Sequence, residues 1–378
     1  MRVFEIAKPN HFKEFLNKLN LDRGGVEIIS NKMELIYIYI KDLKTPAINI
    51  LKQDALSVGA EVAAPSGVIT CAKEKFDCLL IATKRELEAL VKKEKAQPFG
   101  LKEVANEIEK IISAKSYPLK IMGIINANSD SFYSGSRFRG EEAIKEIKKQ
   151  IKDGANIIDI GAVSSRPGSK PVSKEEEINR VKDILQTIKK EKLYEIVDFS
   201  IDSYTPEVVK MALDSGFKYI NDIFGARDEE LIKLAIKYNS KYIIMHMKGT
   251  PQTMQNNPYY ECVVAEVEDF FKEQISKCEN LGLKRENIIL DVGIGFGKRL
   301  EDNLKLLKAH KNFLKFGCEL LIGASRKSLI NNIIPTKIEE RLPGTLAIHI
   351  KAVERGASIV RCHDVREHKI AFEVLKHL

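Results

Sequence analysis

The sequence predicts an α/β protein, a (β/α)₈ TIM barrel preceded by a small N-terminal α/β domain. From Leu119 onward, eight mainly apolar runs alternate with amphipathic helical segments over about 260 residues. Nearly every run also ends in a polar residue, a regularity that the first 115 residues lack. We therefore expect a small domain of unknown role over residues 1–115 and a catalytic barrel over 116–378. An open, doubly wound sheet is the structural alternative.

The composition is that of an ordinary globular protein. Of the 378 residues, 44% are apolar and 30% charged. The longest apolar runs, such as Leu35–Ile40, are too short to span a bilayer, and charges throughout residues 1–20 leave no signal-peptide core. The six cysteines show no metal-binding spacing, which predicts reduced, structural thiols in a cytoplasmic protein.

The net charge of +8 does not by itself indicate nucleic acid. The lysines are spread along amphipathic helices, no nucleic-acid-binding motif accompanies them, and solvated helix faces explain them better. We expect small-molecule substrates and neither a nucleic-acid nor a membrane partner. Attraction of a small anionic substrate is compatible with this charge.

The N-terminal domain has short apolar runs between charged helical stretches. Its patterns predict strands at residues 26–30, 35–40 and 78–81, and helices at 49–58, 84–95 and 101–112. The pair Gly24-Gly25 is expected to open the first strand. The segment Lys115-Ser116-Tyr117-Pro118 reads as a linker.

The barrel strands are predicted from apolar runs and their helices from termination signals. The runs occupy residues 121–125, 157–160, 196–201, 218–222, 241–246, 287–290, 319–323 and 358–362. Gly154 closes the first helix, and the capping box Ser173–Glu176 opens the next. Thr205-Pro206 begins a third helix, which Gly216 follows.

Residues suited to chemistry or recognition stand at the ends of these runs. In chain order they are Asn126 and Asp130; Asp159 and Ser164–Gly168; Asp202; Asn221-Asp222; Met245-His246; Asp291; Ser325–Ser328; and Arg361 with His363. Any one of them could be a satisfied buried polar group. Because the carboxyl ends of barrel strands meet on one face, the whole set predicts an active site there.

The set divides by charge into two halves. Asp202, Asn221 and Asp291 suit the donor-and-acceptor edge of a nitrogen heterocycle, with Met245 and Phe296 as its apolar walls. The opposite half, Arg361, His363 and Asn126, suits a phosphate group and Mg²⁺, and Lys327 lies where barrels often bind phosphate.

The glycine-rich run Ile289–Lys298 has the spacing of neither a dinucleotide fingerprint nor a Walker loop. A strand ends there in Asp291, and alternate glycines then let the backbone approach a flat ligand. Taken alone, this run is equally typical of a tight strand-to-helix turn.

Over residues 119–378 the chain resembles the dihydropteroate synthases. The motifs that carry the resemblance are Gly123–Asn126 with Asp130-Ser-Phe132, Asp159–Gly161 with Arg166–Gly168, Ile201–Ser203, Ile220–Ile223, Met245–Met247 with Gly249–Pro251, Asp291–Lys298, Ser325–Lys327 and Arg361–Asp364. The resemblance implies condensation of 6-hydroxymethyl-7,8-dihydropterin diphosphate with p-aminobenzoate, giving 7,8-dihydropteroate and pyrophosphate for folate synthesis. It also implies Mg²⁺ as cofactor and a homodimer.

The resemblance also implies a role for each matching residue. Pterin would bind to Asp202, Asn221, Met245, Asp291, Phe296, Gly323 and Lys327. Diphosphate would bind to Asn126, Arg361 and His363, with Asn126 also a metal ligand. The p-aminobenzoate would bind to Phe132, Ser165, Arg166, Pro167, Lys327 and Ser328. The catalytic set would be Asp130, Asp202, Asp291, Lys327 and Arg166.

The chain departs from the family pattern mainly in two loops. Ala127-Asn128-Ser129 stands where the family usually has Val-Thr-Pro, and Val163 replaces a glutamate. We expect these changes to affect loop dynamics more than reaction class. Two alternative functions remain: a pterin-dependent corrinoid methyltransferase, and a synthase that uses a ribosylated aminobenzoate phosphate. A third alternative is a binding protein that retains the fold without turnover.

Overall fold

The computed structural model describes residues 16–17, 23–127, 140–163, 168–169 and 172–377. Its chain divides between Ala114 and Lys115 into two compact units, here called the N-terminal unit and the barrel unit. The predicted site residues Asp130, Phe132, Ser165, Arg166 and Pro167 fall outside the described residues.

The N-terminal unit is a three-stranded antiparallel sheet with helices on one face. The strands, in the order β1-β3-β2, are β1 Leu35–Lys44, β3 Lys75–Thr83 and β2 Glu61–Ala63. The helices are α2 Arg23–Ser30, α3 Thr45–Val58, the short 3₁₀ turn η1 Ser66–Val68, α4 Lys84–Glu94 and α5 Leu101–Ile112. Buried apolar side chains of α3, α4 and α5 share one core with Leu80 and Ala82 of β3. On the other face Leu35, Tyr37 and Tyr39 are 53%, 63% and 64% exposed.

The prediction of a strand over residues 26–30 was wrong. These residues belong to helix α2, and Gly24-Gly25 lie in its first turn. Val26 is buried. The Ser30 hydroxyl donates a hydrogen bond to the carbonyl oxygen of Val26, one helical turn earlier, at 2.7 Å. A run this short fits either periodicity, so the apolar residues alone could not separate strand from helix. The other strands and helices predicted for this unit are confirmed.

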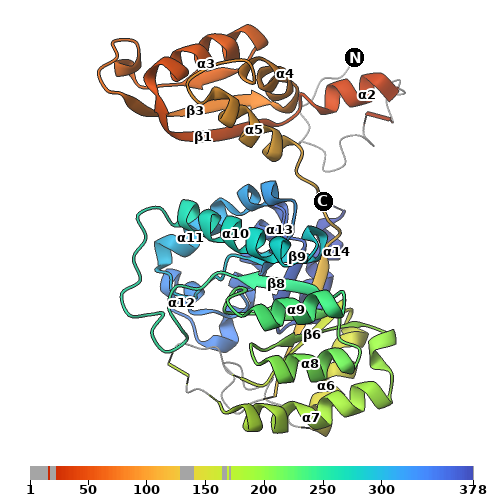
Figure 1. Ribbon diagram of the computed structural model, residues 1–378. Helices are drawn as coiled ribbons and strands as arrows, with labels where there is room; N and C mark the ends of the chain where they lie inside the picture. The colour runs from red at the N-terminus through yellow and green to blue at the C-terminus, as the bar shows by residue number, and fades with distance from the viewer. Residues whose placement is uncertain (1–15, 18–22, 128–139, 164–167, 170–171, 378) are drawn as a thin grey trace. The chain divides into compact units, whose positions relative to one another are not determined.

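The barrel unit is a closed ring of eight parallel strands, in the order β10-β11-β4-β5-β6-β7-β8-β9 (Figure 1). The strands are β4 Lys120–Asn126, β5 Ile157–Gly161, β6 Asp198–Asp202, β7 Tyr219–Asp222, β8 Lys241–Met245, β9 Ile288–Asp291, β10 Glu319–Ile322 and β11 Ile359–Cys362. Each coincides with one predicted apolar run. The predicted TIM barrel is therefore confirmed.

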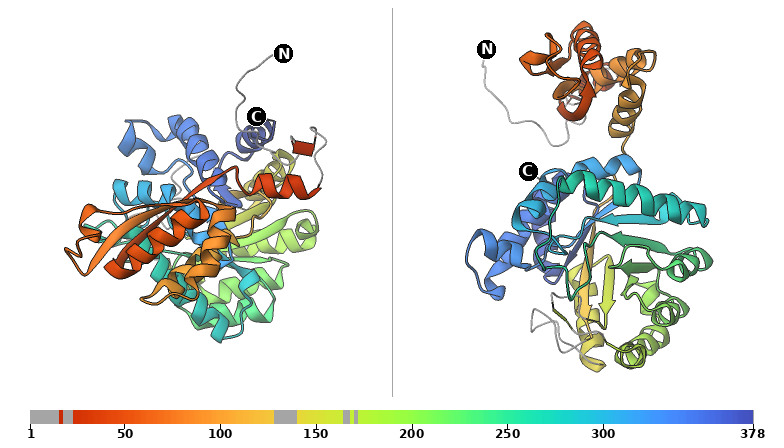
Figure 2. Two further views of the ribbon diagram at one scale, coloured as in Figure 1. Left: turned by 90° about the horizontal axis from the view of Figure 1, so that it is seen from above. Right: turned by 60° about the vertical axis from the view of Figure 1, so that its left-hand side comes forward.

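Helices surround the strands of the barrel unit (Figure 2). They are α6 Glu141–Asp153, α7 Lys174–Lys190, α8 Pro206–Asp214, α9 Glu229–Lys237, α10 Val263–Asn280, α11 Leu300–Lys308, α12 Ser328–Ile333, α13 Leu342–Glu354 and α14 Val365–Leu375. The 3₁₀ turns are η3 Leu193–Glu195, η4 Arg285–Asn287, η5 His310–Phe316 and η6 Ile338–Arg341.

The predicted helix boundaries hold with one change. Pro206 occupies the first turn of α8, and Gly154 ends α6 in the left-handed conformation. At the start of α7, the Ser173 hydroxyl accepts from the Glu176 N–H at 3.2 Å. The Glu176 carboxylate does not complete the capping box, because it accepts from Arg180 instead, at 2.9 Å.

One layer of buried apolar side chains fills the barrel interior. Seven strands contribute to it, with Met122, Ile157, Tyr219, Ile243, Ile289, Leu321 and Ile359. Large side chains from alternate positions close the interior, so the barrel is a packed core and not a pore. This apolar layer is the floor on which the candidate site stands.

Candidate active site

The candidate site is the layer of side chains that follows the apolar layer toward the carboxyl ends of the strands. Because side chains alternate along a strand, the second residue after each member of the apolar layer faces the barrel interior again. From six of the seven members that step leads to Asp159, Asn221, Met245, Asp291, Gly323 and Arg361, and from Met122 it leads to the apolar Ile124. Strand β6 contributes Asp202, which is in register with Asn221.

Arg361 links carboxylates from two other strands. Its Nε donates to Asp159 Oδ2 at 2.6 Å, and its Nη2 donates to Asp202 Oδ2 at 2.7 Å. Asn221 Nδ2 donates to the same Asp159 oxygen at 3.0 Å. Asp159 is fully buried, and its Oδ1 has no hydrogen-bond partner among the described residues. Two carboxylates thus share one guanidinium, and the second oxygen of Asp159 accepts no hydrogen bond from the described residues.

Two carboxylates of this layer, Asp202 and Asp291, have raised pKa values. Burial raises the pKa of Asp202 to about 7; Arg361 opposes the rise, and Asp159 adds to it. Burial also raises the pKa of Asp291, against the lowering effects of Lys327 and of the Gly293 N–H. A carboxyl group that titrates near neutral pH can share a proton with a bound heterocycle.

Lys327 and Phe296 form the wall beside Asp291. The Lys327 Nζ donates to the Ile294 carbonyl at 2.6 Å and lies 4.5 Å from the centroid of the Phe296 ring. Burial lowers the pKa of Lys327 to about 8, although Asp291 acts in the opposite direction. Met245 is part of a buried apolar cluster against which Phe296 packs. The site therefore combines an ionic edge with an apolar wall.

The glycine-rich loop after β9 has close backbone contacts that explain its glycines. A Cβ on Gly293 would lie 2.0 Å from the His246 carbonyl oxygen, and one on Gly297 would lie 2.3 Å from that of Lys248. Both residues also have positive φ, at 65° and 62°. No side chain fits either position.

Lys298 fastens this loop from inside. Lys298 is 3% exposed. Its Nζ donates to the carbonyls of His246, Gly293 and Phe296, at 3.2, 3.0 and 3.0 Å. The His246 ring nitrogen Nδ1 lies 2.9 Å away. Burial lowers the pKa of Lys298 to about 7. This lysine ties the loop to the end of strand β8.

The loop after β10 is held to the end of β11. Ser325 Oγ lies 2.9 Å from His363 Nδ1 and accepts from the His363 backbone N–H at 3.2 Å. Arg326, at a left-handed φ of 53°, forms a bidentate ion pair with Asp364, at 2.9 and 2.7 Å. Its neighbours Ser325 and Lys327 therefore face the site from a backbone held in a conformation unusual for a side-chain-bearing residue.

Comparison with known proteins also relates the barrel unit to pterin-binding enzymes. Residues 122–363 match the family model described as pterin binding enzyme. The bifunctional dihydropteroate synthase/dihydropteroate reductase of Helicobacter pylori is 39% identical over 377 residues, covering 100% of this chain and 99% of that protein.

Among solved structures, the dihydropteroate synthase of Xanthomonas albilineans with 4-aminobenzoic acid has a TM-score of 0.63 at 32% identity. It covers 69% of this chain and 93% of its own. The Anaplasma phagocytophilum dihydropteroate synthase with bound 6-hydroxymethylpterin-monophosphate has a TM-score of 0.63 at 30% identity, covering 69% of this chain and 99% of its own.

This chain belongs to the dihydropteroate synthase family. It is a transferase of folate biosynthesis.

Most of the residues that the sequence assigned to the dihydropteroate synthase site and that the structure describes lie close together. Gly323 borders the site, because a Cβ there would lie 3.8 Å from Arg361 Cβ and 4.0 Å from Asp291 Oδ2. Asn126 ends β4 in register with Gly161, the neighbour of Asp202 on the next strand. Ser328 is an exposed residue that begins α12.

The separation of charges that the sequence predicted requires one correction. Arg361 was expected opposite Asp202, on the phosphate side of the site, but the two are in direct contact. The guanidinium lies between the carboxylates because β11 is closed onto β4 and β5 by the barrel, an adjacency across about 200 residues that no local pattern shows. A dihydropteroate synthase of this geometry couples the two halves of the site through one side chain.

Asp159 and Lys298 are functional candidates that the sequence-based site left out. Asp159 was noted only as a strand end, yet it lies two residues after Ile157 of the apolar layer, so strand alternation could have placed it in the site. Lys298 was assigned no role, and no signal in the sequence distinguishes a buried lysine that binds carbonyls from a solvated one.

The donor set offers limited support for a metal. Among the described residues, no group of three His, Cys, Asp or Glu side chains is arranged to hold a metal ion. The Asn126 carboxamide oxygen is a hard donor of the kind that Mg²⁺ accepts, and Mg²⁺ commonly takes its remaining ligands from substrate phosphates and water. The predicted metal ligand is thus compatible with Mg²⁺ bound together with a diphosphate.

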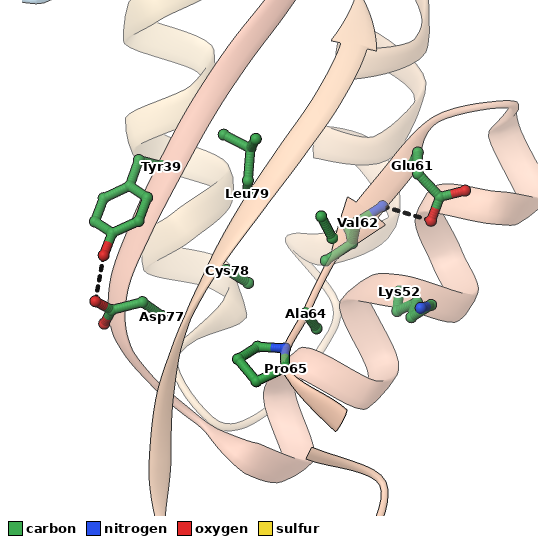
Figure 3. Close-up of a pocket in the computed structure, with 10 residues that line it drawn as sticks. Tyr39, Lys52, Glu61, Val62, Ala64, Pro65, Asp77, Cys78 and Leu79 are labelled. Carbon is green, nitrogen blue, oxygen red and sulfur yellow. Dashed lines mark hydrogen bonds between the residues drawn. The ribbon is translucent and has the colours of Figure 1, made fainter. Parts of the chain in front are cut away.

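A separate hollow of about 500 Å³ lies in the N-terminal unit (Figure 3). It is lined by parts of β1, β2 and β3 and by Lys52 of α3. The Asp77 carboxylate accepts from the Tyr39 hydroxyl and, at 2.9 Å, from the Asp42 N–H, and these hydrogen bonds lower its pKa. Glu61 accepts from the Val62 N–H at 3.1 Å. The carboxylates of Asp77 and Glu61 therefore both accept hydrogen bonds from groups of the N-terminal unit itself.

All six cysteines are free thiols, as the sequence predicted. In the part of the chain that the structure describes, no helix combines the length and the apolar character needed to cross a bilayer.

Proposed function

We propose that the chain condenses 6-hydroxymethyl-7,8-dihydropterin diphosphate with p-aminobenzoate to give 7,8-dihydropteroate and pyrophosphate. The observation that carries the proposal is the polar layer above the barrel floor, in which Arg361 contacts Asp159 and Asp202 and Asn221 donates to Asp159. The family membership supports the reaction, and so do the two related structures, which contain 4-aminobenzoic acid and 6-hydroxymethylpterin-monophosphate.

In this proposal the carboxylate half of the site holds the pterin. Asp202, Asn221 and Asp291 match its row of donors and acceptors, while Met245 and Phe296 pack against its faces. Gly323 leaves room for the ring between Asp291 and Arg361. The raised pKa values of the two aspartates let them share protons with the heterocycle.

The cationic half of the site acts on the leaving group. His363, Lys327 and Arg361 stabilise the negative charge that builds on the diphosphate as its bond to the pterin methylene carbon breaks. The arylamine nitrogen then forms a bond to the methylene carbon of the remaining pterin cation, whose charge Asp202 and Asp291 stabilise, and the new secondary amine releases one proton to water. We propose that Ser328 binds the aminobenzoate together with Phe132, Ser165, Arg166 and Pro167, and that Asp130 assists catalysis.

We propose Mg²⁺ as the cofactor, held by Asn126 and the substrate diphosphate. The ion would neutralise charge on the leaving group. The family resemblance also supports a homodimer in the cytoplasm. Analytical ultracentrifugation of the purified chain decides the oligomeric state.

The purified chain should release pyrophosphate only when dihydropterin diphosphate, an arylamine and Mg²⁺ are all present. A coupled pyrophosphate assay, with each component omitted in turn, measures this. Comparing p-aminobenzoate with its ribosylated phosphate separates the two synthase alternatives, because only the true acceptor should give a high kcat/KM. A folded chain that releases no more pyrophosphate than an enzyme-free control would refute the proposal.

A second activity, reduction of dihydropteroate, is supported by one observation. The Helicobacter pylori relative named as synthase and reductase matches the whole chain, whereas the two solved synthases cover 69% of it. The reaction adds two electrons and two protons to dihydropteroate, so it needs a reduced nicotinamide or reduced flavin. Incubating the full chain with dihydropteroate and each donor, and measuring tetrahydropteroate by chromatography, tests it. Absence of product with every donor would reject this second activity.

A further inference from the structure

Two buried histidines behind the candidate site form a hydrogen-bonded pair. His349 lies on α13 and His368 on α14, and both are fully buried. His349 Nδ1 lies 2.8 Å from His368 Nε2, with the ring centroids 5.0 Å apart. None of the substrate roles proposed above involves either ring.

The pair belongs to a hydrogen-bond chain with one direction. At one end the Ala324 backbone N–H donates to His349 Nε2 at 3.1 Å. At the other end His368 Nδ1 lies 2.6 Å from the Asp364 carbonyl oxygen. The first group can only donate and the last can only accept, so each ring must carry its single proton on Nδ1. Proton uptake by either ring would place two donors against each other.

Ala324 lies in the segment Gly323–Lys327, here called the β10 loop, which supplies the site. Gly323 precedes it beside Asp291 and Arg361, and Ser325 follows it in contact with His363. Asp364, the other end of the chain, is also the residue that Arg326 of the same loop grips. The two histidines and the ion pair therefore close one ring of interactions around the β10 loop.

We propose that His349 and His368 are positioning residues, whose neutral, Nδ1-protonated pair fixes the β10 loop in the geometry that the pterin diphosphate site requires. This inference rests on the proposed function. The histidines act through the Ala324 N–H and touch no substrate. The substrate class is that of the barrel site, and the step affected is productive binding of the phosphorylated pterin.

Two physical arguments support a positioning role over simple filling of space. If the two rings only filled space, an apolar pair of similar volume would do so without the cost of burying ring nitrogens. Such a pair would leave the Ala324 N–H without an acceptor, so the hydrogen bond to Ala324 is what the histidines add. Burial also lowers the pKa of both rings, and His368, Lys327 and His363 lower that of His349 further. The pair is thus held neutral, as its hydrogen bonds require.

The first experiment compares His349→Phe, His349→Gln and the double variant His349→Phe/His368→Phe. Phenylalanine removes the acceptor for Ala324, whereas the glutamine amide oxygen can replace Nε2. We expect His349→Phe to lower kcat/KM for the pterin diphosphate about tenfold or more, as small misplacements of site groups do. We expect His349→Gln to recover most of that loss. The double variant should recover part of the thermal stability lost in His349→Phe, because His368 Nε2 is no longer left unpaired. It should remain impaired in kcat/KM, because the Ala324 N–H still lacks its acceptor.

The matched control is Asn287→Ala, which breaks a partly buried 3.0 Å hydrogen bond to Asn239 just before β9, away from the site. It should lower the unfolding midpoint with little change in kcat/KM. If His349→Phe reduces kcat/KM no more than this control, or if glutamine fails to recover activity while folding normally, the positioning role is wrong.

A second measurement needs neither a variant nor activity. Two-dimensional ¹⁵N–¹H spectra of the imidazole nitrogens of the full chain should show two histidines protonated on Nδ1 at neutral pH, assigned by comparison with His349→Gln. Finding either ring protonated on Nε2 or doubly protonated overturns the proposal. This result stands even if the wild type proves to have no synthase activity, so failure of the proposed function and failure of this inference are distinguishable.

Discussion

At Asp202, burial, the Arg361 guanidinium and the Asp159 carboxylate all act on one ionisable group. Its side chain is 12% exposed, and its pKa is raised to about 7. A pKa raised on folding favours the protonated form in the folded chain. As pH rises from about 4 to about 7, the free energy of unfolding of the wild type therefore falls relative to that of a variant in which residue 202 cannot ionise.

Replacing Asp202 with asparagine should reveal this dependence. The free energy of unfolding of Asp202→Asn, relative to wild type, should increase between pH 4 and pH 7 and stay constant above, by up to about 1.4 kcal/mol for each unit of pKa shift. The Arg361 contact is already included in the net pKa shift, so its loss affects the size of the difference and leaves its direction unchanged. Urea denaturation at several pH values measures the difference. A difference that is flat or falls with pH would contradict the raised pKa.

The same variant should lose pterin binding at all these pH values. Stability above pH 7 and substrate affinity thus make opposite demands on this residue, which is common where binding groups are buried before the ligand arrives. Calorimetry with an unphosphorylated pterin gives the affinity.

At the scale of elements, the loop after β9 depends on one lysine. Lys298→Met keeps the length of the side chain and removes its donors, so carbonyls of His246, Gly293 and Phe296 lose their partner. Because each unsatisfied buried acceptor costs about 1–3 kcal/mol, the loop should detach from β8. We expect weaker pterin binding and a lower unfolding midpoint.

Lys241→Met is the matched control. Lys241 also donates to a carbonyl, that of Glu286 at 2.6 Å, but it stands at the beginning of β8, at the other end of the strand from the site. Calorimetry and thermal unfolding should show a change in midpoint without a change in pterin affinity. Equal losses of affinity in both variants would mean that Lys298 has no particular hold on the loop.

The sequence could predict the barrel strands because each is an apolar run with turn signals on both sides. The period-two alternation of side chains then indicates which residues of a strand face the barrel interior. It could not decide α2, where Val26 and two isoleucines fit a strand and a helix equally well. In the site, it located Arg361 and Asp202 correctly as strand ends. Their contact depends on barrel closure and on rotamers, neither of which is written in local sequence.

The His349–His368 pair was beyond prediction for a related reason. Each histidine stands alone in its helix pattern, and their helices are separate elements that meet only in the packed barrel. A residue whose role is defined by a partner on another helix has no local signature.

For the whole molecule, the division into two units predicts a division of labour. Every described residue of the candidate site belongs to the barrel unit. A chain that begins at Lys115 should therefore keep the synthase reaction, with kcat/KM within about threefold of the full chain, while any reduction of dihydropteroate should be lost.

Parallel assays of pyrophosphate release and tetrahydropteroate formation on both chain lengths test this prediction, with circular dichroism to verify folding. A folded, inactive barrel would show that the N-terminal unit contributes to synthesis. Reduction that survives the truncation would assign the second activity to the barrel instead.

The two-residue step between the apolar layer and the site has a genetic consequence. A base substitution in a site codon alters one binding group and leaves the layer beneath it intact, so specificity can drift while the fold persists. Loss of a single codon from a barrel strand has another effect, because every later side chain in that strand turns to the opposite face. Asp159 or Asp291 would then point toward the helices and an apolar neighbour into the site. These strands can therefore tolerate amino-acid substitutions far more readily than insertions or deletions.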